Sequence, residues 1–316
     1  ATAAAKDLGI SVAFDDWTAV IDDPNIDAVT IATPPSVQPE IAIAALTHRK
    51  HVFCEKPLAL SFEAAQRMAA TADREGFANM VDFEFPEIEP WKCAKQMLDD
   101  GELGALNHIS ISWNVQTYAN KNRLSSWKTN ANEGGGALFS FVSHCFYYLE
   151  WFVGPAKRIS TRLFSAPDDK RAVDTLAVVW FEMESGLPVS LNVSTDALFG
   201  GGHRIEFYGA DGTLILENRT SDYARGFRLL HGRRISDRLE EVQTAVSARN
   251  STNGDGRTGS VARIVGRFVD WIETGVPSSP SFREGARVQL LLEAARRSHD
   301  SGTWVDLADV GLAHLA

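Results

Sequence analysis

The first third of the sequence alternates short apolar runs with segments of helical periodicity. The apolar runs cover residues 28–32, 51–54 and 77–81, and continuous runs of this length are typical of strands buried on both faces. Between them lie two predicted helices, the second capped by Ser61 and closed by Gly76. Alternation of strand and helix implies a parallel sheet with right-handed crossovers.

The chain opens on a helix rather than a strand. Residues 1–8 read as the end of an alanine-rich helix that Gly9 closes, and no glycine-rich phosphate loop occurs in the 316 residues. A helix with no strand before it cannot start a parallel sheet. We therefore expect that a strand–helix–strand unit of roughly 30 residues or more is missing upstream.

The pattern changes after Asp82. Apolar residues alternate with polar ones over residues 109–115, as in a strand with one buried face. The same alternation returns over residues 159–164, 175–182, 189–195, 204–208 and 213–216. Turn residues at 185–186 and 211–212 predict two hairpins. We expect an open, mostly antiparallel sheet with helices on one side.

The predicted fold class is therefore α/β plus α+β, with a truncated Rossmann sheet before the open sheet. The domain prediction is a partial dinucleotide-binding domain over 1–83 and a substrate and oligomerisation domain over 84–316. Two helices close the chain, the second opening with Ser281 and Glu284 in capping-box spacing. One option is that these helices pack back on the first domain.

Composition excludes several classes of partner. The net charge is −10, and no basic cluster is present, which argues against nucleic acid or an anionic membrane. An odd number of cysteines (Cys54, Cys93, Cys145) without metal-ligand spacing favours a reducing compartment and no metal site. No apolar run reaches the roughly 18 residues of a membrane span. We expect a cytoplasmic protein.

The motif Cys54-Glu55-Lys56-Pro57 directly follows a predicted buried strand. Ligands collect at strand carboxyl ends in open α/β sheets. A desolvated lysine there can lose its proton near neutrality, or donate hydrogen bonds to an alcohol or carbonyl oxygen. The alternative is a surface lysine paired with Glu55. The buried strand and the proline favour a functional Lys56.

A second motif is Glu133-Gly134-Gly135-Gly136 before a helix that contains His144. Glycines let the backbone approach a ligand and leave helix amides pointing at it. Histidine suits proton transfer near pH 7, and His144 shares a helix face with Ser140, Tyr147 and Tyr148. The alternative is a buried histidine satisfied by a backbone carbonyl.

Weaker candidates lie elsewhere in the chain. Trp127 and Lys128 could contact a cofactor or cover the core. Asp82 and Glu84 could serve as general acid and base, although helix capping or solvated charge is favoured. His203 follows three glycines in a segment that could cover the site, although a flexible hairpin tip is favoured.

These motifs resemble the Gfo/Idh/MocA family of NAD(P)-dependent oxidoreductases. The resemblance is carried by residues 28–35, the Glu-Lys-Pro motif at 55–57, residues 134–138 with His144, and the predicted hairpin at 204–214. It covers essentially the whole chain, in order. It implies hydride transfer between nicotinamide and a sugar, cyclitol or related carbonyl compound, and an open sheet that often builds a homodimer or homotetramer.

The resemblance also implies roles for residues of this sequence. Lys56 and His144 are the implied catalytic residues. The implied cofactor contacts are Thr33, Pro34, Glu55, Lys56, Trp127 and Lys128, and the substrate contacts we expect are Tyr118, Tyr147, Tyr148 and His203. The phosphate-binding loop and the residue that recognises the cofactor ribose lie outside this sequence, so the choice between NAD and NADP remains open. We expect the chain as it stands to bind either one poorly.

Four positions depart from the family pattern. Many members carry aspartate four residues before the histidine, where this chain has Ser140. Serine cannot take up a proton near neutrality as a carboxylate can, so a histidine–aspartate relay is not expected. Tyr147 replaces a frequent aspartate, and Asp82 and Glu84 stand where Asn and Arg are frequent. These changes predict an atypical, more aromatic pocket.

Two alternatives to a dehydrogenase stay open. Some relatives hold NAD tightly and cleave glycosides through transient oxidation, with no net change in the cofactor. Others bind nucleotide and sugar only to regulate partners, and the loss of the aspartate at Ser140 keeps this possibility in view.

Overall fold

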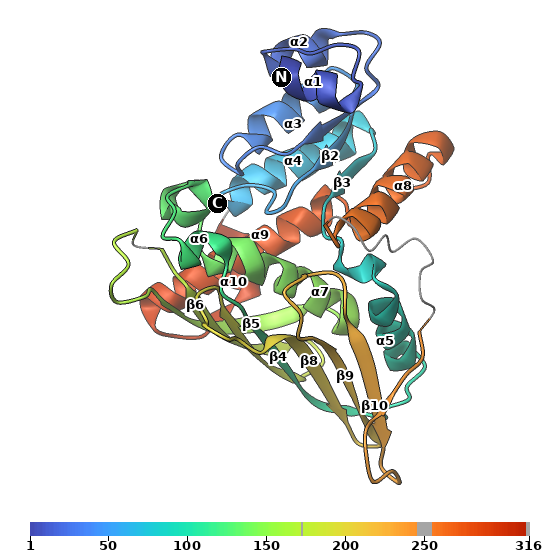
Figure 1. Cartoon of the computed structure of the whole chain (residues 1–316), viewed down its shortest axis with the longest axis vertical. Helices are drawn as coiled ribbons and strands as arrows, with labels where there is room; N and C mark the ends of the chain where they lie inside the picture. The colour runs from blue at the N-terminus through green and yellow to red at the C-terminus, as the bar shows by residue number, and fades with distance from the viewer. Residues whose placement is uncertain (172, 245–254, 314–316) are drawn as a thin grey trace.

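The computed structural model describes residues 1–171, 173–244 and 255–313. Figure 1 shows a small sheet with helices α1 to α4 at one end of the molecule and a large sheet at the other, with α7 and α9 between them. The predicted fold class is confirmed: a parallel Rossmann-like sheet precedes a large, mostly antiparallel sheet.

The small sheet consists of three parallel strands in the order β1, β2, β3. They are β1 (Ala28–Ile31), β2 (His51–Cys54) and β3 (Asn79–Val81). Four helices precede or connect them: α1 (Thr2–Leu8), α2 (Trp17–Asp22), α3 (Gln38–Thr47) and α4 (Phe62–Glu75). The predicted caps of α4 are present, because Ser61 Oγ accepts from the amide of Ala64 at 3.2 Å and Gly76 has a φ of 74°.

The prediction of strands buried on both faces holds for β3 and nearly all of β2 and is wrong for β1. Val52, Phe53 and Cys54 are buried, whereas Ala28 and Thr30 are exposed. In the described chain, β1 is an edge strand that pairs only with β2. A β-branched run therefore predicted the strand correctly and its environment incorrectly.

The large sheet has nine strands in the order β11-β10-β9-β8-β4-β7-β6-β5-β12. Its strands are β4 (Leu106–Asn114), β5 (Ala156–Phe164), β6 (Leu176–Met183), β7 (Pro188–Ser194), β8 (Gly202–Gly209), β9 (Gly212–Asn218), β10 (Arg228–Arg233), β11 (Glu240–Glu241) and β12 (Val305–Asp306). Only the β4–β7 pair is parallel within this sheet as described. Both predicted hairpins, β6–β7 and β8–β9, are confirmed.

Helices cover one face of the large sheet. Between β3 and β4 lie the 3₁₀ turn η1 (Phe85–Glu87) and α5 (Glu89–Asp99), and the π-helical turn η4 (Leu138–Val142) leads into α7 (Ser143–Val153). The chain closes with α8 (Thr258–Thr274), α9 (Phe282–Ser301) and α10 (Leu307–Ala313). In β4, Ile109, Ile111 and Trp113 are buried beneath this layer, while Ser110 and Ser112 lie on the opposite, less covered face.

The closing helices contact both sheets. Helix α9 packs against α4 and β3 on one side and against β5 and α7 on the other, and it lies between the two halves in Figure 1. Its predicted capping box is present, with the Ser281 amide donating to Glu284 Oε2 at 2.7 Å. Phe268 of α8 packs against Phe53 of β2. The boundary at residues 83 and 84 stays a prediction.

Gly285 of α9 packs closely against Leu58 and against Val81 of β3, and it provides a test of this packing. An added Cβ would lie 2.8 Å from Leu58 Cδ2 and 3.0 Å from Val81 Cγ2. We expect Gly285→Ala to lower the free energy of unfolding, because overpacking costs about 1–3 kcal/mol. The measurement is denaturant unfolding of the purified protein.

Gly266 in α8 is the matched control, since an added Cβ there meets nothing within 4 Å. We expect Gly266→Ala to raise the free energy of unfolding by about 0.5–1 kcal/mol, through helix propensity alone. An equal gain in both variants would show that α9 does not approach the small sheet as described.

Candidate active site

Lys56 lies just beyond the carboxyl end of β2 and points towards the helix layer. Its Nζ donates a hydrogen bond of 2.7 Å to the backbone oxygen of Ser140. The following turn is held by Gln38 of α3, whose Nε2 donates to the oxygen of Pro57 at 2.7 Å. The Glu55 carboxylate accepts from the backbone amide of Lys56 at 3.2 Å. The geometry thus differs from a surface lysine paired with Glu55.

Lys56 is half-buried, and its environment is mostly acidic. Burial lowers the pKa of Lys56 below its ordinary value, and the nearby carboxyl groups of Glu84, Glu55 and Asp82 oppose that shift. The ammonium of Lys128 acts in the same direction as burial. Such a lysine can donate a strong hydrogen bond to a substrate oxygen.

The glycine motif does not present free amides to a ligand, and that expectation is wrong. The amide of Gly135 donates to the oxygen of Asn130 at 2.9 Å, and that of Gly136 to the oxygen of Lys128 at 3.1 Å. The amide of Leu138 donates to the Asp174 carboxylate at 2.7 Å. A Cβ at Gly136, whose φ is 104°, would overlap that carboxylate. The glycines therefore allow a tight turn that fixes the start of the helix.

His144 lies one helical turn after Ser140 and is 6% exposed. Its ring stands edge-on to Phe83 and Phe85, with centroids 6.0 and 5.0 Å away. Within the described residues, Nδ1 has no hydrogen-bond partner. Burial, followed by the positive charge of Lys56, holds the pKa of His144 well below its usual range. The imidazole is therefore neutral near pH 7, and its Nδ1 is not satisfied by a backbone carbonyl.

Asp82 and Glu84 are neither solvated nor helix-capping, contrary to expectation. They are 7% and 5% exposed, and Glu84 makes no side-chain cap hydrogen bond to η1. Glu84 Oε2 lies 3.8 Å from His144 Nδ1. Burial and the neighbouring carboxylates raise the pKa of Asp82 to about 8, and burial also raises that of Glu84. Their position directly after a buried strand was the signal available in the sequence.

The four residues predicted to contact substrate do not gather in one place. Tyr147 is 8% exposed and stacks on Phe83, with centroids 4.5 Å apart. Tyr148 is fully buried, and its hydroxyl lies 2.9 Å from Nε2 of His203. Tyr118 is 76% exposed at the start of the short helix α6 (Tyr118–Lys121). Their role as substrate contacts stays a prediction.

The favoured hairpin-tip interpretation of the segment before His203 is wrong. His203 belongs to β8, which pairs with β4 rather than with the preceding strand β7. Its ring is 4% exposed and stacks on Trp113 at a centroid distance of 4.2 Å. Burial lowers the pKa of His203 to about 3, so the ring is a neutral part of the core.

The residues expected to contact a dinucleotide border the carboxyl edge of the small sheet. Thr33 and Pro34 follow β1 and are half-buried. Thr33 Oγ1 is buried and has no hydrogen-bond partner among the described residues, as expected of a group whose partner is a ligand. Trp127 is half-buried and Lys128 exposed, with the Lys128 ammonium 5.5 Å from the Trp127 ring centroid. Their cofactor roles stay predictions.

Arg257, just before α8, is a charged residue near the site that the sequence did not reveal. Its positive charge acts on Glu84, Glu55 and His144. It also forms hydrogen bonds with Asp255. Nothing in the local sequence links residue 257 to residues 55 or 84, since the contact is created only by the packing of α8.

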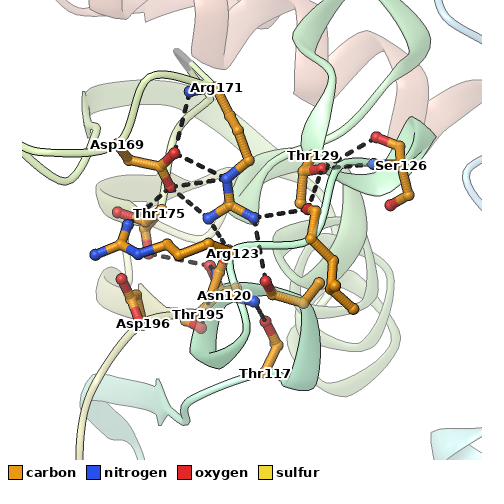
Figure 2. A network of polar contacts seen from close by, with 12 residues as sticks. Thr117, Asn120, Arg123, Ser126, Thr129, Asp169, Arg171, Thr175, Thr195 and Asp196 are labelled. Carbon is orange, nitrogen blue, oxygen red and sulfur yellow. Dashed lines mark hydrogen bonds and ion pairs between the residues drawn. The ribbon is translucent and has the colours of Figure 1, made fainter.

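A polar network fixes the segment that carries Trp127 and Lys128 (Figure 2). The Arg171 guanidinium donates to the backbone oxygens of Ala119 and Leu124 at 3.2 and 2.9 Å. It also contacts Asp169, whose carboxylate pairs with Arg123 at 3.2 Å. The bonds from Arg171 hold the pKa of Asp169 at about 2, so the carboxylate is charged. The network joins α6 to the turn before β6.

None of the helices in the described part of the chain is both long and apolar enough to span a membrane. Within the same residues, no group of three or more His, Cys, Asp or Glu side chains forms a metal site.

Comparison with known proteins identifies two family models in the chain. An NAD-binding Rossmann-fold oxidoreductase model matches residues 1–83, and a GFO/IDH/MocA C-terminal domain model matches residues 91–215. The first match starts at residue 1 and does not confirm a missing upstream unit, which stays a prediction.

Three similar proteins cover nearly the whole chain. An uncharacterised oxidoreductase of Synechocystis is 31% identical over 97% of this chain and 86% of its own length. Levoglucosan dehydrogenase of Pseudarthrobacter phenanthrenivorans is 26% identical over 98% of this chain and 87% of its own length. A solved structure of a levoglucosan dehydrogenase with NADH and levoglucosan has a TM-score of 0.86 at 25% identity, covering 97% and 87% of the two chains.

The raised pKa of Asp82 predicts how stability depends on pH. The folded protein keeps this proton up to about pH 8, whereas an unfolded aspartate loses it near pH 4. The free energy of unfolding should therefore fall as pH rises across that window, by at most about 1.4 kcal/mol per pH unit. We expect Asp82→Asn to reduce this fall, as measured by denaturant unfolding at pH 5 and pH 8.

The control for this measurement is Asp270→Asn, on the exposed side of α8. It should retain the pH dependence of the wild type. If Asp82→Asn also retained it, the carboxyl group would not be held protonated in the fold.

The network around Arg171 predicts that its loss loosens α6. We expect Arg171→Met to speed hydrogen exchange of backbone amides over residues 119–124, because two of their carbonyls lose a donor. Lys170→Met removes the same charge from an exposed neighbour and should leave these rates unchanged. Equal rates in both variants would show that the network does not hold the segment.

Proposed function

The chain belongs to the Gfo/Idh/MocA family of oxidoreductases, and from that premise we propose that it interconverts an alcohol and a ketone of a sugar or cyclitol with NAD or NADP. The observation that carries the proposal is the hydrogen bond from Lys56 Nζ to the Ser140 oxygen at 2.7 Å. This bond holds the Lys56 side chain at Ser140, which lies one helical turn before His144 in the chain.

The residues at the sheet edge fit a dinucleotide. Thr33 and Pro34 after β1, Lys56 with Glu55 after β2, and the segment with Trp127 and Lys128 would hold it. The unpartnered hydroxyl of Thr33 supports this assignment. When bound, the nicotinamide accepts hydride from the substrate carbon or supplies it.

We assign the proton chemistry to Lys56 and His144. In the oxidation direction, the Lys56 ammonium donates a hydrogen bond to the reacting oxygen and stabilises the negative charge that develops there. His144 accepts the hydroxyl proton, and its lowered pKa keeps it in the neutral, accepting form near pH 7. In reduction the same proton returns from His144.

The charge around Lys56 favours an uncharged polyhydroxy substrate. Glu55 and Glu84 both act on Lys56, and negative charge beside the reacting position repels an anionic ligand. The names of two similar proteins agree with this class, since one is a levoglucosan dehydrogenase and another, from Thermotoga maritima and 25% identical, a myo-inositol 2-dehydrogenase.

We also propose that the less covered face of the large sheet joins two or more copies of the chain. That face carries the short polar side chains Ser110 and Ser112 of β4 and the 46% exposed Trp180 of β6. Small side chains allow two sheets to approach closely, and an exposed tryptophan is common at interfaces.

Replacement of Lys56 tests the proposal. We expect Lys56→Ala to lower kcat by at least about 100-fold, because the reacting oxygen loses its hydrogen-bond donor. Binding of NADH, followed by its fluorescence, should weaken far less than kcat falls, because Lys56 is only one of the residues that would hold the dinucleotide. Turnover is measured as the net change in nicotinamide absorbance across a panel that includes levoglucosan and myo-inositol.

Lys6→Ala, on the exposed side of α1, serves as the control and should retain full activity. Near-normal turnover by Lys56→Ala would remove the proposal. Product formation without a net absorbance change would instead indicate a redox glycosidase. Stoichiometric sugar binding without turnover would indicate a regulator.

A further inference from the structure

We infer that Glu84 is the positioning residue for His144, directing its Nδ1 proton and stabilising its charged form. This inference rests on the proposed function and deepens it. In this chain the position four residues before His144 holds Ser140, whose side chain cannot supply a negative charge. A carboxylate reaches the ring from a different element instead.

The geometry brings Glu84 and His144 together from separate parts of the chain. Glu84 follows β3, while His144 lies in the first turn of α7. Glu84 Oε2 is 3.8 Å from His144 Nδ1, and the two residues are 5% and 6% exposed. Nδ1 is buried and lacks a hydrogen-bond partner among the described residues. An approach of about 1 Å would form a charge-assisted hydrogen bond.

The carboxyl groups of Asp82 and Glu84 do not ionise equally near pH 7. The pKa of Asp82 is raised to about 8, so its carboxyl group is neutral near pH 7. Burial raises the pKa of Glu84 too, but the Lys56 ammonium opposes this shift more than any other neighbour does. Lys56 therefore favours Glu84 as the ionised member of the pair.

The charged and titratable groups that shift the pKa of His144 all oppose its protonation. They come from three elements: Lys56 after β2, His203 on β8 and Arg257 before α8. Glu84 provides the only carboxylate within 4 Å of the His144 ring nitrogens in the described chain. Without Glu84, the imidazolium that forms during the reaction would face the positive charges of Lys56 and Arg257 with no carboxylate within 4 Å of its ring nitrogens among the described residues.

This arrangement defines the proton step. The neutral ring carries its proton on Nδ1, directed at Glu84, which leaves the Nε2 lone pair free. In oxidation the substrate O–H bond breaks and an Nε2–H bond forms, while the electron pair of O–H becomes the second carbonyl bond as the carbon releases hydride. Glu84 stays a carboxylate and neutralises the imidazolium, much as the carboxylate of a catalytic triad does.

Imidazole NMR on the protein without substrate tests the inference directly. The nitrogen shifts of His144 near pH 7 should show Nδ1 protonated and Nε2 unprotonated in the wild type. In Glu84→Leu, which removes acceptor and charge, the proton should redistribute towards Nε2. Asp82→Asn replaces a carboxyl group that is already neutral, so it should preserve the wild-type tautomer. An Nε2 proton in the wild type, or no redistribution in Glu84→Leu, would overturn the inference.

The pH profile of kcat for oxidation provides a second readout. Loss of the carboxylate lowers the pKa of His144, so the acidic limb should move down by about 1 pH unit or more. The plateau should fall by roughly 100-fold. Glu84→Asp, which keeps the charge at a longer distance, should lie between wild type and Glu84→Leu. An unshifted acidic limb would contradict the inference.

The two readouts separate this inference from the proposed function. If wild type turns over no sugar of the panel, the proposed function fails while the tautomer is still measurable. If wild type is active and its His144 tautomer does not depend on Glu84, only the inference fails. Should Glu84→Leu not fold, the tautomer in Glu84→Asp decides: a partial shift of the proton towards Nε2 supports the inference, and an unchanged tautomer overturns it.

Discussion

One hydrogen bond joins the two segments that carry the proposed catalytic residues. Lys56 Nζ, at the end of a parallel strand, donates to the carbonyl oxygen of Ser140 in the π-helical turn before α7. A different side chain fixes each end of this hydrogen bond. Gln38 fixes the turn after Lys56, and Asp174 fixes the start of the helix that carries His144. The relative position of lysine and histidine thus depends on groups that take no part in proton transfer.

Charged groups of both signs act on one another around this bond, and burial shifts the pKa values of several of them. Carboxyl groups of Glu55, Asp82 and Glu84 surround Lys56, and Arg257 provides further positive charge. Removing charges from water is costly unless they are paired, and here the result is a set of shifted pKa values rather than tight ion pairs. Such shifts are typical of sites that transfer protons.

The sequence predicted the positions of helices and strands more reliably than the burial of their residues. Periodicity and caps located α4 and α9, and turn residues located the two hairpins. The burial of Asp82 and Glu84 could not be read from local pattern, because it depends on η1 turning beneath α7. The segment before His203 looked like a hairpin tip, since the sequence does not show that β4 inserts between β7 and β8.

The same limit applies to the site. Lys56 and His144 were predicted because each motif carries a local signal, a proline after a strand or glycines before a helix. The roles of Asp174 and Arg257 depend on contacts between residues far apart in the chain. The glycine motif was assigned to ligand binding because a sequence does not reveal which groups accept its amide protons, and here protein oxygens accept several of them.

The most direct test of the central claim is a crystal structure of the protein with NADH and a sugar that it turns over. We expect one sugar oxygen to lie within hydrogen-bond distance of both Lys56 Nζ and a ring nitrogen of His144. A sugar bound with its reacting carbon at the nicotinamide, but with neither group in contact with its oxygen, would show that Lys56 and His144 are not the catalytic residues.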